Sequence, residues 1–301
     1  MRSSRASTTT PMTTDAVRYL GRIGVDPGLP PTVETLRLVH RTHQDAVPYE
    51  NFGIMLANAT GVAPPPVDTG ACVARVADVG RAGYCFHQNA ALGAGLEALG
   101  FDVTRRHGHV WTLPEHRALT DLNHLVLVVS GLPTDDNPGG LWWPDVGLGE
   151  GFRDPVALVD GAFDDGGFGY AVDGASADSW SFSNAPGGSF TGIEVTARPV
   201  GADVIEAAHG ELSTPPAGHF SRVLVVQRRQ DTHYDSLRGC VLGRHEAAGR
   251  DERDVTSYDD WRAALVEVVR VPVDDVPDDD LRTLWSSVRR AHDAWDAAGR
   301  P

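Results

Sequence analysis

One nonapeptide, Arg81-Ala82-Gly83-Tyr84-Cys85-Phe86-His87-Gln88-Asn89, is a turn of small residues that then opens a helix, the last helix of the N-terminal part of this chain. From residue 15 to about residue 100 apolar residues recur with the helical period. After Gly100 they alternate, or form short runs between Gly- and Asp-rich turns, as strands do. Helical periodicity returns near the C-terminus. We therefore predict an α+β fold with helices first, a β-barrel or sandwich in the centre and a mixed C-terminal part.

The helical stripes are short. Val17, Leu20 and Ile23 predict one helix, and Leu36, Val39, His40 and His43 predict a second that Thr32 caps and that ends before Pro48. A third begins near Cys85, carries Asn89, Leu92, Leu96 and Leu99, and ends at Gly100; Gly93 and Gly95 inside it suggest close packing against a neighbour. Two C-terminal helices are predicted, one starting at Ser257 and one along Leu281–Trp295.

Eight strands are predicted from period-two patterns and short apolar runs. They are Phe101–Arg106, His109–Thr112, His124–Val129, Leu141–Val146, Phe168–Val172, Ser179–Phe182, Ile193–Ala197 and Arg222–Gln227. The predicted organisation is a disordered leader over residues 1–14, a helical domain over 15–100, a β-barrel domain over 101–210 and an α/β domain over 211–301.

Composition excludes several classes of function. The chain has 301 residues and a formal net charge of −15, and its 26 basic residues are all Arg. An acidic chain lacks the clustered cations that phosphate contacts require, so we expect no nucleic-acid partner. No apolar run approaches the roughly 18 residues of a membrane helix. Three cysteines cannot all pair and no signal peptide is recognisable, which predicts a reducing compartment, the cytoplasm.

Cys85 is the candidate nucleophile because of its surroundings. A thiol at a helix N-terminus feels the positive end of the helix dipole, which favours the thiolate. His124, at the start of a strand, is the candidate base, and Asp145, in an apolar segment, is the candidate orienting carboxylate. Each residue also has a structural reading, as a buried inert thiol, a core histidine and a turn aspartate. Spacing alone leaves both readings open.

The chain resembles the arylamine N-acetyltransferases at several motifs in register. Arg81–Asn89 is similar to the family's R-G-G-Y-C-F-E-x-N motif, His124 to its strand-borne histidine, and Asp145–Gly149 to D-V-G-F-G. Val47–Phe52 resembles V-P-F-E-N-L. Further similar segments are Tyr19–Gly24, Pro31–Leu36, and Ser213–Pro216 followed by His219–Ser221.

This resemblance implies a cysteine-protease-like triad of Cys85, His124 and Asp145, and a helical domain, a β-barrel and an α/β lid over the cleft. It implies that Cys85 takes an acetyl group from acetyl-CoA, or another acyl thioester, and passes it to an arylamine or hydrazine in a ping-pong cycle. No permanently bound cofactor and no metal are implied. Further implied site residues are Tyr49, Val110, Gly147, Leu148, Gly149 and Phe220 for substrate or cofactor binding, and Arg22, Glu50 and Arg81 as a structural ion network.

Four departures from the family pattern bear on specificity rather than on the triad. Ala82 replaces a glycine, His87 stands where Glu is common, Leu148 replaces Phe, and His109 stands where Arg is frequent. His107, His109 and His116 lack further ligands at metal-site spacing, so no metal site is predicted.

Three other functions remain open at this stage. One is an amide synthase of the ansamycin type, which takes its acyl group from an acyl carrier protein. The second is a papain-like amidase or thioesterase with the same triad. The third is a binding module without catalysis, which is the least favoured.

Overall fold

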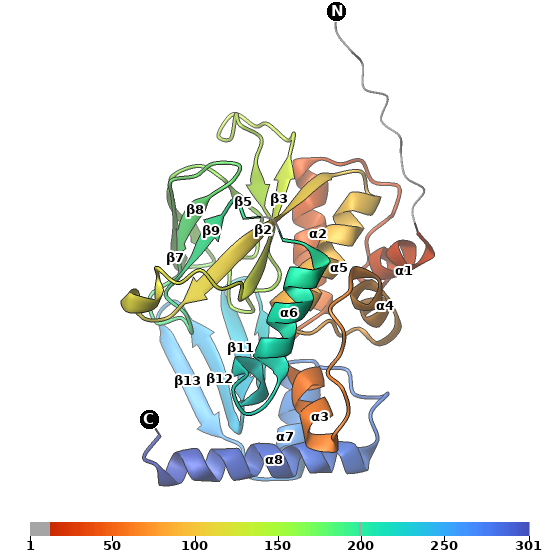
Figure 1. The fold of residues 1–301 in the computed structure, drawn as a ribbon, viewed down its shortest axis with the longest axis vertical. Coiled ribbons are helices and arrows are strands. Elements are labelled where there is room, and N and C mark those ends of the chain that lie inside the picture. The colour runs from red at the N-terminus through yellow and green to blue at the C-terminus, as the bar shows by residue number, and fades with distance from the viewer. Residues whose placement is uncertain (1–12, 199, 301) are drawn as a thin grey trace, which may run out of the picture.

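The computed structural model describes residues 13–198 and 200–300 (Figure 1). Eight α-helices and thirteen strands lie within these ranges. The helices are α1 Thr14–Arg22, α2 Val33–Ala46, α3 Phe52–Thr60, α4 Thr69–Val79, α5 Cys85–Ala98, α6 Ala202–Ser213, α7 Tyr258–Ala263 and α8 Asp278–Ala297; Pro114–His116 and His219–Ser221 are 3₁₀ turns and Ala264–Val268 is a π-helical segment. Most of the predicted leader lies outside the described residues, and Thr13 caps α1.

The strands form two antiparallel sheets. They are β1 Tyr49–Glu50, β2 Asp102–Trp111, β3 His124–Ser130, β4 Trp142–Trp143, β5 Val156–Ala157, β6 Gly161–Asp165, β7 Phe168–Asp173, β8 Trp180–Ser183, β9 Gly192–Thr196, β10 Val225–Arg229, β11 His233–Arg238, β12 Val241–Glu246 and β13 Gly249–Asp254. The larger sheet has the order β5-β4-β3-β2-β9-β8-β7-β6 and the smaller one β1-β10-β11-β12-β13.

The predicted barrel is an open, curled sheet. Its edge strands β5 and β6 do not pair with each other in the described part of the chain. Near one edge, β4 and β5 have only two residues each, and an irregular loop runs between them over residues 144–155. Because few backbone groups there are used in the sheet, this loop is free to contact the helices, and it carries Asp145.

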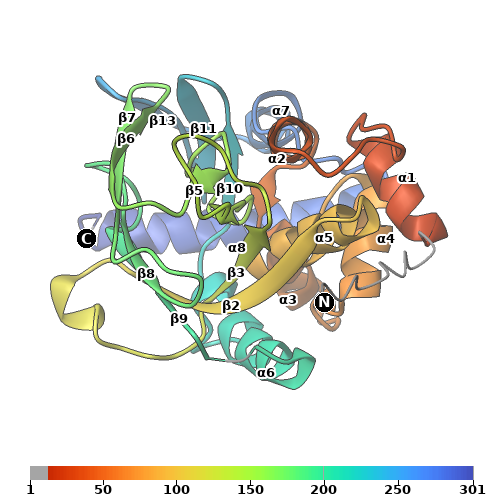
Figure 2. The same cartoon turned by 90° about the horizontal axis from the view of Figure 1, so that it is seen from above.

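The helices before residue 100 gather on one side of the molecule and the larger sheet on the other (Figure 2). Helix α5 packs between the two, in contact with α1, α2 and α4 and with β2 and β3. Gly95 allows this, because a Cβ there would collide with the Tyr19 ring, and a Cβ at Gly93 would just touch Leu127. The predicted close packing of α5 is confirmed.

Capping explains where several helices begin. The side chains of Thr13, Thr32 and Asp68 each accept a hydrogen bond from a backbone N–H in the first turn of α1, α2 and α4. Ser257 does the same for α7. The predicted starts at Thr32 and Ser257 are therefore confirmed, and of the first predicted stripe only Val17 is exposed, at 41%.

Several element predictions need correction. Phe101–Arg106 and His109–Thr112 are parts of one strand, β2, since Gly108 stays in register opposite His124. The predicted strand Leu141–Val146 is ordered as strand only at Trp142–Trp143. Sequence reading missed α3, α4 and α6, the short strands β1, β5 and β6, and the hairpins of β11–β13, in part because β13 is exposed at every position and shows no apolar alternation.

Three hydrophobic clusters make up the core. The first joins the N-terminal helices to one face of β3, the second joins α7 and α8 to the smaller sheet, and the third lies on the other face of the larger sheet. Phe52 and Met55 of α3 belong to the second cluster although they precede residue 100. The domain boundaries at residues 100 and 210 stay a prediction.

Candidate active site

Cys85 is the first residue of α5 and is 2% exposed. Tyr84 precedes it with extended backbone and supplies no side-chain cap, so the first-turn N–H groups keep their positive potential beside the sulfur. The thiol Sγ lies 3.5 Å from the carbonyl oxygen of Asn123. Gly147 closes over it, since a Cβ at that position would overlap the Cα of Cys85.

His124 lies between Cys85 and Asp145. Its Nε2 donates to Oδ2 of Asp145 over 2.7 Å, and its side chain also makes a hydrogen bond with Cys85, which leaves Nδ1 for the sulfur. Burial by itself lowers the pKa of His124. The charge and hydrogen bond of Asp145, together with the contact to Cys85, outweigh burial and raise this pKa to about 10. The ring is therefore an imidazolium at neutral pH.

Asp145 is fully surrounded by donors. Oδ1 accepts from the side-chain amide of Asn89 at 2.8 Å and from the backbone N–H of Gly147 at 2.9 Å. Oδ2 accepts from His124 and, at 3.1 Å, from the indole N–H of Trp143. Four donors stabilise the ionised carboxylate and fix its plane. Asn89 was predicted only as part of a helix face, because its spacing from Cys85 gives no sign that it contacts residue 145.

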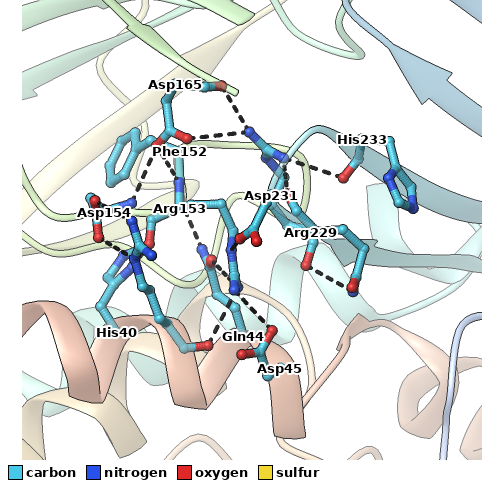
Figure 3. A network of polar contacts seen from close by, with 12 residues as sticks. His40, Gln44, Asp45, Phe152, Arg153, Asp154, Asp165, Arg229, Asp231 and His233 are labelled. Carbon is cyan, nitrogen blue, oxygen red and sulfur yellow. Dashed lines mark hydrogen bonds and ion pairs between the residues drawn. The ribbon is translucent and has the colours of Figure 1, made fainter. Parts of the chain in front are cut away.

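A second buried histidine holds the backbone of the Asp145 loop. Nδ1 of His40 in α2 lies 2.8 Å from the carbonyl oxygen of Arg153, and Nε2 lies 3.1 Å from the backbone nitrogen of Asp145. Burial lowers the pKa of His40, so the ring is neutral, donating from Nδ1 and accepting at Nε2. Arg153 is held in turn by Asp45 at 2.9 Å and Asp231 at 3.2 Å (Figure 3).

The same loop is tied to the C-terminal part of the chain. Arg229 of β10 is buried and donates to the carbonyl of Gly151 at 2.8 Å. It also donates to the carbonyl of Asp165 at 3.0 Å (Figure 3). The loop over residues 151–154 is thus fixed by α2 on one side and by the strand β10 on the other. We refer to this set of contacts, made by His40, Arg153, Arg229 and Asp231, as the loop brace.

The predicted binding residues surround Cys85 to different degrees. Burial raises the pKa of Tyr49, and negative charge at Cys85 and Glu150 raises it further, which places the phenol close to both. Gly149, with φ of +70°, packs against Tyr49 and Gln227. Leu148 is buried with the third cluster, and the ring centroid of Phe220 lies 4.4 Å from that of Tyr84. Val110 is in β2, the strand that pairs with β3. The side chain of Asn123, which precedes His124, accepts from the Val110 N–H and donates to the Val110 carbonyl.

The predicted ion network of Arg22, Glu50 and Arg81 takes another form. Arg81 pairs with Asp275 at 2.7 Å, and the Arg22 guanidinium packs against Gly80. Burial raises the pKa of Glu50, and the charge of Arg75 opposes this. Within the described residues these three side chains make no direct ion pair with one another, because the acidic partner of Arg81 comes from a segment nearly 200 residues away.

Besides Leu148, three residues depart from the family pattern: Ala82, His87 and His109. Ala82 is fully buried in the first cluster. His87 is buried with Nε2 3.2 Å from the Pro65 carbonyl, and burial, with a smaller contribution from His209, lowers its pKa to about 3. His87 is therefore neutral, and it adds no charge beside Cys85. His109 contacts the carbonyls of Asp121 and His116.

The other two cysteines are unlike Cys85. Burial raises the pKa of Cys72 to about 12 and that of Cys240 to about 11, so both are protonated at neutral pH. Over residues 13–198 and 200–300 no group of three or more His, Cys, Asp or Glu side chains is placed to hold a metal ion. In the same ranges no helix has the length and apolar character needed to cross a bilayer.

Comparison with known proteins agrees with this geometry. A family model described as N-acetyltransferase matches residues 32–277. An arylamine N-acetyltransferase of Mycolicibacterium smegmatis is 28% identical over 293 residues, which cover 92% of this chain and 99% of the relative. A solved structure of the M. smegmatis arylamine N-acetyl transferase has a TM-score of 0.78 and 26% identity, over 92% of this chain and 99% of that one.

Two further proteins differ in what their names report. The Mycobacterium marinum arylamine N-acetyltransferase, solved in complex with CoA, shares the fold, with a TM-score of 0.77 and 23% identity over 92% of this chain and 99% of that one. A proansamycin X synthase of Amycolatopsis mediterranei is 31% identical over 147 residues, covering 48% of this chain and 52% of that protein.

Proposed function

Because this chain belongs to the arylamine N-acetyltransferase family, a family of acyltransferases, we propose that it moves an acetyl group from acetyl-CoA to an arylamine or hydrazine through a thioester on Cys85. The observation that carries the proposal is the unbroken chain of contacts from the sulfur through His124 to Asp145. The M. marinum relative was solved with CoA, which supports CoA as the carrier of the donor group.

In the first half-reaction the Cys85 thiolate attacks the carbonyl carbon of acetyl-CoA. The new S–C bond forms as the carbonyl π electrons move to oxygen, and the tetrahedral intermediate then expels the CoA sulfur. His124 enters as imidazolium and gives its Nδ1 proton to that leaving sulfur. Asp145 stabilises the imidazolium and keeps the ring in place. The products are free CoA, acetyl-Cys85 and a neutral His124.

In the second half-reaction the amine nitrogen attacks the acetyl carbon of acetyl-Cys85. His124, now neutral, takes a proton from the attacking nitrogen, and the Cys85 thiolate leaves. Thiolate and imidazolium are thereby restored and the amide is released. Near-complete burial of the three side chains limits competing attack by water on the thioester.

The test is intact-mass spectrometry of the protein exposed to acetyl-CoA. We expect one acetyl group on the wild type and on Cys72→Ala, which removes a protonated buried thiol, and none on Cys85→Ala. Addition of an arylamine should remove the group and yield one acetylated amine per protein. Unchanged labelling of Cys85→Ala would end the proposal.

The similarity to proansamycin X synthase makes an amide synthase the second candidate. The proposed triad of Cys85, His124 and Asp145 would serve an amide synthase equally well, so catalytic residues do not separate the two. Parallel incubation with acetyl-CoA and with an acyl carrier protein thioester does: faster acylation of Cys85 by the carrier-protein thioester would replace CoA as the donor. Release of acetate without any amine would instead indicate an amidase or thioesterase.

A further inference from the structure

A cavity with no contribution from Cys85 lies between α8 and the segment that follows the 3₁₀ turn at residues 219–221. Its volume is about 380 Å³, within the usual range of small-molecule sites. In Figure 1 α8 runs along the lower edge of the molecule, below α3 and the smaller sheet. The cavity shares no residue with the proposed catalytic and substrate-binding set.

Much of the cavity lining is apolar. Leu224, Val288 and Met55 of α3 are part of it and are themselves buried. Val223, Val241, Ala291 and Trp295 extend this surface. Apolar side chains of this kind favour binding of an aromatic or alkyl group, because binding removes apolar surface of both from water.

The same lining also carries positive charge. Arg222 and Arg238 both border the cavity and are exposed, and none of its lining residues is Asp or Glu, although the chain has 41 acidic residues. In the described part of the chain neither arginine forms an ion pair with a carboxylate; Arg222 donates only to the carbonyls of Pro216 and Ala217.

Arg222 and Arg238 line the same cavity, and the charges of both also act on His219. The pKa of His219 is lowered by burial first, and then by the positive charges of Arg238 and Arg222. A neutral imidazole therefore senses both cations at once. Two arginines without carboxylate partners that line one cavity together with apolar side chains form a recognition pattern for an amphipathic anion.

We propose that this cavity binds a small organic carboxylate, with the carboxylate at Arg222 and Arg238 and an aryl or alkyl body against the partly exposed side chains of Val223, Val241 and Trp295. The site lies behind the segment that presents Phe220 to Tyr84. The Asn51 amide bonds the carbonyls of Phe220 and Val223, which keeps that segment in place between the cavity and Cys85. Binding here does not depend on acetyl transfer.

Calorimetric titration of the full chain with 4-phenylbutyrate tests the site, with the uncharged 4-phenylbutyramide as matched ligand. We expect the carboxylate to bind and the amide to bind at least about tenfold more weakly, since it cannot form the charge-assisted bonds. The double variant Arg222→Gln, Arg238→Gln should weaken the carboxylate by a similar factor. The control is Arg282→Gln. Arg282 lies on α8, the helix that lines the cavity, but is not itself a lining residue, so this change should leave the affinity unchanged.

A second readout is independent of affinity. The carboxylate should offset the two guanidinium charges and raise the pKa of His219, measured by its ring-proton NMR titration, and the amide should not. Equal binding of acid and amide, or unchanged binding by the double variant, would refute the site. If 4-phenylbutyrate competed with acetyl-CoA and slowed the acylation of Cys85, the cavity would be part of the donor site. That result would refute the proposal that the cavity binds its ligand independently of acetyl transfer. Cys85 acylation itself would be intact in either of the first two cases.

Discussion

Asp145→Asn changes one atom and reverses a hydrogen bond. In the wild type each carboxylate oxygen accepts two hydrogen bonds, Oδ1 from Asn89 and Gly147 and Oδ2 from His124 and Trp143. An amide offers one acceptor and one donor. When its NH₂ faces Nε2 of His124, that nitrogen must accept, and the ring proton moves to Nδ1, facing the sulfur. The ring then has no free nitrogen to take a proton from Cys85.

The magnitude follows from the position of the His124 pKa. Asp145 and Cys85 hold it at about 10 against burial, compared with 6.5 for the free side chain. One unit of pKa difference corresponds to about 1.36 kcal/mol, so the surroundings favour the imidazolium over the neutral ring by roughly 5 kcal/mol relative to the free side chain. Without the carboxylate, burial lowers the pKa below its usual value and the ring is neutral at pH 7. We expect turnover to fall by about 10³ to 10⁴, as the same change does in a serine-protease triad.

Two assays on the purified protein measure this effect. One is kcat for transfer of acetyl to an arylamine, and the other is the rate at which iodoacetamide alkylates Cys85 as a function of pH. In the wild type the imidazolium persists until the pH rises through about 10, and the variant should lose it near or below neutrality. Asp154→Asn, which removes a half-exposed carboxylate paired with Arg41, is the matched control and should keep both rates. A near-wild-type kcat in a folded Asp145→Asn variant would remove Asp145 from the mechanism.

The raised His124 pKa also fixes how stability depends on pH. A group whose pKa is higher in the folded state than in the unfolded state stabilises the fold fully below its unfolded pKa. For His124 the contribution is therefore complete below pH 6.5 and declines as the pH rises through about 10. Denaturant titrations between pH 6 and 10.5 should show this loss in the wild type and a smaller one in Asp145→Asn.

Three other substitutions test parts of the site. Gly147→Ala should slow acylation, because its Cβ would overlap the backbone of Cys85 and force the turn away at a cost of about 1–3 kcal/mol; unchanged acylation kinetics would contradict this packing. His40→Asn should lower kcat more than it raises KM, because the backbone N–H of Asp145 loses its hydrogen-bond acceptor. The high-pH limb of the kcat profile should also shift to lower pH. A loss of stability with an unaltered pH–rate profile would give His40 a structural role only. His87→Glu should lower the melting temperature, because a carboxylate would face a backbone carbonyl in a buried site, and it should change relative rates across a panel of amines; equal stability and an equal profile would refute it.

Local sequence signals were sufficient for the central features of the fold. The small-residue turn before Cys85, the apolar period after it and the caps at Thr32 and Ser257 act within one or two helical turns, and each is found where predicted. The single strand β2 was divided in two because Gly108 interrupts its pattern, and the partner strand β3 restores its continuity. That information lies in the pairing and not in the segment itself.

The contacts around the site are long-range, which is why most were not predictable. Asn89 bonds Asp145 across 56 residues, and His40 reaches the Asp145 backbone across 105. The resemblance implies that Arg81 belongs to an ion network with Arg22 and Glu50, and in the structure Arg81 pairs with Asp275. A single sequence does not say which of many carboxylates an arginine will meet once distant segments pack.

The loop brace has a consequence for how the protein matures. During synthesis α2 and the Asp145 loop are complete well before Arg229 and Asp231 emerge, and until then the Arg153 guanidinium has only its α2 partners. We therefore expect the Asp145 loop of the nascent chain to be incompletely fixed, so that Cys85 does not react with thioesters until the C-terminal part of the chain has packed against it. A reactive centre assembled late in this way protects an unfinished chain from acylating itself.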